Sequence, residues 1–211
     1  MFSFLHRQKI IWSQKKIATS IVVSLLFLVL SFVVNNYANV YSLAHISSPV
    51  NDIILDNIPT VDVHLIFSEG AILLVLIIVA LLVNEPKYIP FVVKSIALFI
   101  IVRSLFMILT HLGPPHNQIY INPHDFIQTV SAGGDMFFSA HTGLPFLMAI
   151  IFWPKRILRY FFLLATIIGG TAVLLGHLHY SIDVFSALFI SFGIYHIAKF
   201  YFKEDLALLE S

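Results

Sequence analysis

Two short segments of the chain concentrate side chains that could do chemistry. The first contains Ser139 and His141, and the second contains His179, Tyr180 and Asp183. If the chain is helical from Tyr180 onward, His179 and Asp183 share one helix face, where the carboxylate can fix an imidazole tautomer. The other imidazole nitrogen then becomes a nucleophile, and His141 can donate a proton to a leaving oxygen. This pattern predicts phosphoryl transfer through a histidine intermediate.

A metal centre is the alternative for the same segments. Three or four zinc ligands could come from a set of five side chains: His141, His177, His179, Asp135 and Asp183. Their spacing matches no motif of zinc enzymes, and the histidine route needs no metal. We therefore expect neither a metal nor another cofactor. His177 either caps a helix or lines the site, and both interpretations stay open.

Arg103 is a cation in the middle of an apolar run. Burying it in a membrane costs about 2.5–3.5 kcal/mol on insertion scales, so it needs an anionic partner. A lipid phosphate fits the planar guanidinium fork, and a carboxylate such as Glu69 or Asp183 is the alternative.

The elements that must position these residues are transmembrane helices. Of the 211 residues 59% are hydrophobic and only 11% are charged, whereas soluble domains are about one quarter charged. The net charge of +1 gives no reason to expect a nucleic-acid partner. Six apolar runs are each long enough to be a span: 17–34, 65–83, 91–112, 137–153, 158–178 and 182–202. We predict an all-α integral membrane protein, a bundle of six transmembrane helices forming one domain over residues 1–211.

The basic residues predict the orientation of this bundle. Lysine and arginine mark the cytoplasmic side of membrane proteins, and segments 35–64 and 111–136 contain neither. A basic amino-terminal segment (1–16) and a short tail (204–211) would both be cytoplasmic. The first run lacks an obvious cleavage site, so we expect a span there rather than a signal peptide. The histidine site would face the periplasm, the exterior or a lumen.

The two chemical segments closely resemble motifs of the sphingomyelin synthase family, which belongs to the wider type-2 phosphatidic acid phosphatase superfamily. Residues 134–142 read Gly-Asp, three residues, then Ser-Ala-His-Thr, and residues 179–184 read His-Tyr-Ser-Ile-Asp-Val. Weaker likenesses are the aspartate segment at 49–52 and the arginine segment that begins at Arg103. The resemblance implies a catalytic triad of His141, His179 and Asp183. We expect substrate contacts from six further residues: Arg103, Asp135, Ser139, Tyr180, Asp52 and His177.

The resemblance also implies an activity. Such an enzyme would move a phospho-alcohol head group, of phosphocholine or phosphoethanolamine type, from a glycerophospholipid to ceramide, diacylglycerol, a similar alcohol or water. Its partners would be the donor lipid, the lipid alcohol acceptor and the surrounding membrane lipids; nothing indicates an oligomeric state. Ala140 stands where the family has glycine, which leaves the substrate range open. A lipid phosphate phosphatase is the second hypothesis, and a lipid transporter or binding protein without enzymatic activity is the third.

Overall fold

A computed structural model of the chain describes residues 15–119 and 136–210, and every regular element in these ranges is helical. The all-α prediction is therefore confirmed for this part of the chain. Seven α-helices are described: α2 (Lys15–Ala44), α3 (Gly70–Asn84), α4 (Ile89–Thr110), α6 (Ala140–Ile151), α7 (Arg156–Leu175), α8 (Ser181–Tyr201) and α9 (Lys203–Glu210). Three short turns join them: η1 (Leu55–Asn57), η2 (Leu65–Glu69) and η3 (Pro86–Tyr88).

Five of the helical segments are long and apolar enough to cross a membrane: Lys15–Ala44, Leu65–Asn84, Pro86–Thr110, Arg156–Leu175 and Ser181–Tyr201. The remaining predicted span, 137–153, corresponds to α6, which has only 12 residues. A helix of that length rises about 18 Å, well short of a hydrocarbon core of about 30 Å. The described residues thus support five of the six predicted spans, and the span predicted over 137–153 is not confirmed.

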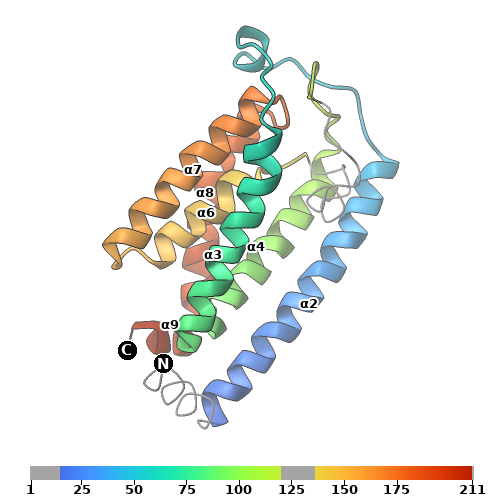
Figure 1. Cartoon of the computed structure of the whole chain (residues 1–211). Helices are drawn as coiled ribbons and strands as arrows, with labels where there is room; N and C mark the ends of the chain where they lie inside the picture. Colours follow the sequence, from blue (N-terminus) through green and yellow to red (C-terminus); the bar gives the residue numbers. More distant parts are fainter. Residues whose placement is uncertain (1–14, 120–135, 211) are drawn as a thin grey trace.

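The helices form a bundle in which α2, α3, α4, α6, α7 and α8 run alternately up and down (Figure 1). Helix α2 packs along α4 on one side, while α6 packs against α7 and α8. The loops 45–64, 111–119 and 176–180 gather at one end of the bundle (Figure 1) and are joined by backbone hydrogen bonds. The start of α2 lies at the opposite end, beside α9. Side chains from distant parts of the sequence therefore meet at the loop end.

Helix α2 continues ten residues past the predicted end of the first span, to Ala44. The prediction ended at residue 34 because two asparagines follow. In the structure neither asparagine ends the helix, and Asn35 contacts α4. Ser104 Oγ donates to Asn35 Oδ1, and Ser42 Oγ donates to the Met107 carbonyl. Polar contacts between the two helices thus carry α2 beyond its apolar stretch.

Helix α6 begins at Ala140, three residues later than the predicted span. Phe138 and Ser139 are apolar or neutral enough to continue a helix, but their backbones are used elsewhere. The Phe138 carbonyl accepts a hydrogen bond from Arg103, and the Ser139 amide donates to the Asp183 carbonyl. The fourth apolar run is therefore partly extended, and its first residues join α6 to its neighbours.

The predicted short tail is in fact a helix, α9, that packs against the end of the bundle. Leu206 and Leu209 are buried there. Lys94 Nζ donates to both Asp205 and Ser20, and Ser20 also donates to Asp205. The Lys94 and Asp205 side chains are only 12% and 10% exposed. This network links α2, α4 and α9.

We predict that Asp205→Ala destabilises the protein strongly. Losing one partner of a buried ion pair typically costs about 3–5 kcal/mol, because the other charge stays buried and unpaired. The neighbouring Glu204 pairs with Lys16 on the surface, where the side chains are 70% and 73% exposed. Glu204→Ala is therefore the matched control and should have almost no effect. Thermal unfolding in detergent measures both; equal melting temperatures for the two variants would show that the buried network does not hold α9.

Candidate active site

The carboxylate of Asp183 and the imidazole of His179 form a buried pair. Asp183 lies in the first turn of α8 and is 0% exposed, and His179 lies two residues before the helix. His179 Nδ1 donates to Asp183 Oδ2 at 3.2 Å, and the Tyr180 amide donates to the same oxygen at 3.0 Å. Because a carboxylate only accepts, Nδ1 carries the hydrogen. The Nε2 nitrogen of neutral His179 therefore has a free lone pair.

A backbone hydrogen bond joins this pair to the segment that carries His141. The Ser139 amide donates to the Asp183 carbonyl at 3.2 Å, which places the start of α6 beside the start of α8. Ser139 is the residue before α6 and is fully buried, and His141 follows in the first turn. The two imidazoles are close enough to interact electrostatically. The structure thus brings His141, His179 and Asp183 into one cluster.

His141 is held from two sides. Its Nε2 donates to the Phe67 carbonyl at 3.1 Å, and its ring stacks on the Phe67 ring with centroids 4.2 Å apart. On the other side, the carbonyl of His141 packs directly against Gly169 of α7, where any side chain would collide with it. Pro145 is four residues further on and has no amide hydrogen to donate to that carbonyl. His141 therefore has a fixed position although it lies in the first turn of a short helix.

Arg103 enters the cluster from α4. Its side chain is buried, its Nε donates to the Phe138 carbonyl at 2.8 Å, and Nη1 contacts the Met107 sulfur at 3.4 Å. It also interacts electrostatically with Asp183. Glu69, the other predicted partner, lies beside His64 instead, with 3.9 Å between His64 Nδ1 and Glu69 Oε2. Of the two carboxylates considered, Asp183 is the one that interacts electrostatically with Arg103.

Asp52 fixes the outer loop onto the start of α8. Its Oδ2 accepts from the Ser181 amide at 2.7 Å, and its Oδ1 accepts from the amides of Ile54 and Leu55. Burial alone would raise the pKa of this carboxyl, but the hydrogen bonds outweigh burial and hold the pKa below its usual value. An aspartate predicted to contact substrate thus uses both oxygens to accept backbone hydrogen bonds.

Tyr180 connects the same loops through its hydroxyl group. The hydroxyl donates to the Gly113 carbonyl at 2.9 Å and accepts from the Val50 amide at 3.1 Å. Burial raises the pKa of this hydroxyl, so it stays protonated at neutral pH. Tyr180 holds the loops around the histidine cluster together.

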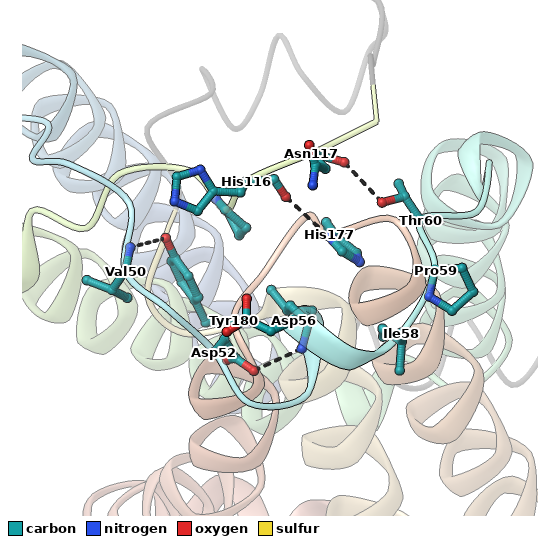
Figure 2. Close-up of a pocket in the computed structure, with 12 residues that line it drawn as sticks. Val50, Asp52, Asp56, Ile58, Pro59, Thr60, His116, Asn117, His177 and Tyr180 are labelled. Carbon is teal, nitrogen blue, oxygen red and sulfur yellow. Dashed lines mark hydrogen bonds between the residues drawn. The ribbon is translucent and has the colours of Figure 1, made fainter.

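A pocket of about 380 Å³ lies beside this cluster, at the loop end. Figure 2 shows that its walls come from loop residues 50–60, from His116 and Asn117, and from His177 and Tyr180. His177 Nδ1 donates to the His116 carbonyl at 3.1 Å. Its Nε2 is buried and has no hydrogen-bond partner among the described residues. His177 thus lines the pocket, with its Nε2 unpaired among the described residues and shielded from solvent.

The predicted site residues divide into three groups. Arg103, Ser139, His141, His179 and Asp183 lie together in the buried cluster, while Asp52, His177 and Tyr180 line the adjacent pocket. Asp135 lies outside the described residues. Within the described ranges no three histidine, cysteine, aspartate or glutamate side chains are grouped to hold a metal ion.

Two contributors to the cluster could not be predicted from the sequence. Phe67 and Phe138 act through their carbonyl oxygens, which accept from His141 and Arg103. A backbone carbonyl is present in every residue, so no residue type reveals it. Phe67 also lies about seventy residues before His141 in the sequence, and its apolar run predicted only a transmembrane helix.

Comparison with protein families finds one similarity, and it lies in this region. Residues 133–200 match the model described as PAP2 superfamily C-terminal, and the matched segment contains His141, His179 and Asp183. The match covers less than half of the chain and shows a similarity to this superfamily over the segment from the residues before α6 to α8. No curated protein and no solved structure matches the chain.

We predict that Asp52 makes a pH-dependent contribution to stability. A carboxyl whose folded-state pKa is below the usual 3.8 stabilises the fold above that value, and the contribution is lost as the pH falls through the folded-state pKa. Asp52→Asn should cost about 1.5–3 kcal/mol at neutral pH, because charged hydrogen bonds to backbone amides are lost. The difference in melting temperature from wild type should shrink as the pH is lowered below 4. Asp56→Asn, which changes an exposed neighbour in the same loop, is the control; an equal effect there, or a difference that does not vary with pH, would contradict the role given to Asp52.

Proposed function

We propose that this protein is a membrane phosphotransferase of the sphingomyelin synthase type, which moves a phospho-alcohol head group from a glycerophospholipid to a lipid alcohol or to water. The observation that carries the proposal is the hydrogen bond from His179 Nδ1 to the buried Asp183 carboxylate. It leaves His179 Nε2 as a nucleophile, with a second histidine and an arginine as close electrostatic neighbours. A nucleophile, its orienting carboxylate, a proton donor and a cation are the parts that covalent phosphoryl transfer requires.

In the first step His179 Nε2 attacks the phosphorus of the donor lipid. A phosphorus–nitrogen bond forms, and the bond from phosphorus to the diacylglycerol oxygen breaks. Protonated His141 gives its proton to that oxygen, so diacylglycerol leaves as a neutral alcohol. Asp183 stabilises the positive charge that develops on His179, and Arg103 balances negative charge on the phosphoryl oxygens.

In the second step the acceptor resolves the intermediate. An alcohol or water oxygen attacks the phosphorus, His141 takes its proton, and the phosphorus–nitrogen bond breaks. His179 returns to its neutral form with the hydrogen still on Nδ1. The proton that His141 gave away in the first step is regained in the second, so one turnover leaves the enzyme unchanged.

The pocket beside the cluster favours a donor whose head group is positively charged. Its lining includes Asp52 and Asp56 and no lysine or arginine. The free His177 Nε2 accepts a hydrogen bond rather than donating one in neutral imidazole. A phosphocholine or phosphoethanolamine group complements such walls, whereas the dianion of a phosphate monoester is repelled by them. This contrast supports head-group transfer over a lipid phosphate phosphatase, the second hypothesis.

The membrane orientation belongs to the same proposal. The loops around the pocket contain no lysine or arginine, and the basic residues Lys16, Lys94 and Lys155 lie at the other end of the helices. Such a distribution favours a cytoplasmic location for α9 and an outward-facing site. Donor and acceptor lipids would then come from the outer leaflet.

Replacing each of the two histidines should affect the reaction rate in a different way. His179→Ala removes the nucleophile, whereas His141→Ala removes only the proton donor. Loss of a general acid costs about 10²–10⁴-fold in rate, and a leaving group that needs no proton should restore much of it. A phosphodiester of an acidic phenol that carries the preferred head group should therefore rescue His141→Ala but not His179→Ala. Release of phenol by each purified variant in detergent measures this difference.

His45→Ala is the matched control, because His45 is an exposed histidine at the same end of the bundle. It should behave as wild type with both donors. If His179→Ala hydrolyses the phenol ester as fast as wild type, His179 is not the nucleophile. If neither histidine variant affects release of the head group, the proposed function fails as a whole.

A further inference from the structure

The ring and the carbonyl of Phe67 both contact His141, and this double contact has no role yet in the reaction. The two rings are nearly parallel, with 23° between their planes and 4.2 Å between their centroids. The Phe67 carbonyl accepts from His141 Nε2 at 3.1 Å. One residue therefore fixes both the plane of the imidazole and the direction of one of its N–H bonds.

The carbonyl also determines which nitrogen of His141 is available for chemistry. A carbonyl only accepts hydrogen bonds, so Nε2 carries the hydrogen in this contact. In neutral His141 the lone pair is then on Nδ1. When His141 is protonated, Nε2–H can stay on the Phe67 carbonyl while Nδ1–H is free to be transferred.

We propose that Phe67 is a positioning residue for His141, and that it directs proton transfer to and from the reacting oxygen through His141 Nδ1. This inference rests on the proposed function for its chemistry. In the first step the Nδ1–H bond breaks as the diacylglycerol oxygen gains the proton, and Nε2–H remains on the carbonyl throughout. In the second step Nδ1 takes the acceptor's proton.

The surroundings of Phe67 suit a residue that must not move. It is 7% exposed and packs in a cluster with Val63, Ala172, Val173 and Val184. Its backbone lies in η2, a turn of π-helix in which the Gly70 amide donates to the Leu65 carbonyl, five residues back. Such turns are rare and are common at functional sites. Gly169 of α7 packs against the His141 backbone, so His141 contacts both α7 and η2.

The test compares two substitutions of Phe67 with two donors. Phe67→Leu keeps an apolar side chain and the backbone carbonyl but removes the flat ring, whereas Phe67→Tyr keeps the ring. Misplaced catalytic groups cost up to about a hundredfold in rate, so Phe67→Leu should lose about ten- to a hundredfold with the natural lipid donor. With the acidic phenol ester the rate of Phe67→Leu should fall only slightly. Phe67→Tyr should retain most of the wild-type activity with the lipid donor.

A double-mutant cycle separates positioning from packing. If Phe67 acts through His141, adding Phe67→Leu to His141→Ala should cause no further loss with the lipid donor. Phe162→Leu is the matched control, because Phe162 is a buried ring stacked on Phe152 away from the cluster. Its effect on the rate should be the same with both donors. The inference is overturned if Phe67→Leu lowers the rate equally with both donors. It is also overturned if the rate loss of Phe67→Leu adds fully to that of His141→Ala. Phe67→Met replaces Phe67→Leu if the leucine variant does not fold.

A second readout does not depend on activity. Nitrogen NMR of the protein labelled with ¹⁵N-histidine reports which ring nitrogen carries the hydrogen, and the His141 signals are assigned by their loss in His141→Gln. Wild type and Phe67→Tyr should show the Nε2–H tautomer, and Phe67→Leu should shift toward a mixture. A wild-type His141 with the hydrogen on Nδ1 would overturn the inference. If wild type transfers no head group, the proposed function fails while the contact between Phe67 and His141 is still judged by these spectra.

Discussion

The buried carboxylate of Asp183 is the group around which the rest of the structure is arranged. It is fully shielded from solvent, and its Oδ2 accepts hydrogen bonds from the His179 imidazole and the Tyr180 amide. A buried charge is costly unless it is paired and hydrogen-bonded. The chain compensates Oδ2 with a histidine and a backbone amide and brings the guanidinium of Arg103 from α4 into electrostatic reach, while Oδ1 has no hydrogen-bond partner among the described residues. The same contacts that make the charge tolerable orient the proposed nucleophile.

This constraint explains several features of the fold that are otherwise unrelated. Helix α6 begins late because the residues before it bond to Arg103 and to the Asp183 backbone. The outer loop returns to the start of α8 because Asp52 accepts from the Ser181 amide there. Tyr180 joins the same outer loop, at Val50, to the loop 111–119, at Gly113. Helix α6 is too short to cross a membrane alone, and its first turn lies where it can present His141 to the pair.

The sequence predicted the helical class of the fold and which residues meet, but not how they are supported. The spacing of His179 and Asp183 predicted their contact, and the buried charge of Arg103 predicted an anionic neighbour. The predicted end of the first span, at residue 34, was too early, because Asn35 accepts a hydrogen bond from α4 and α2 continues. The packing of α9 was not predicted, because it depends on a partner, Lys94, more than one hundred residues away. Long-range polar contacts and backbone carbonyls leave no local pattern, and they account for most of what was missed.

The most direct test of this account is to trap the covalent intermediate. Wild-type protein is mixed rapidly with a donor lipid whose head group is isotopically labelled, and the reaction is stopped with base, because phosphorus–nitrogen bonds of histidine are labile in acid. Mass spectrometry of the digested protein should then find the labelled phospho-alcohol on His179 within the first turnover, and it should disappear as product forms. Label on a different residue, or a first turnover that yields product with no labelled protein at any time, would contradict the claim that His179 is the nucleophile.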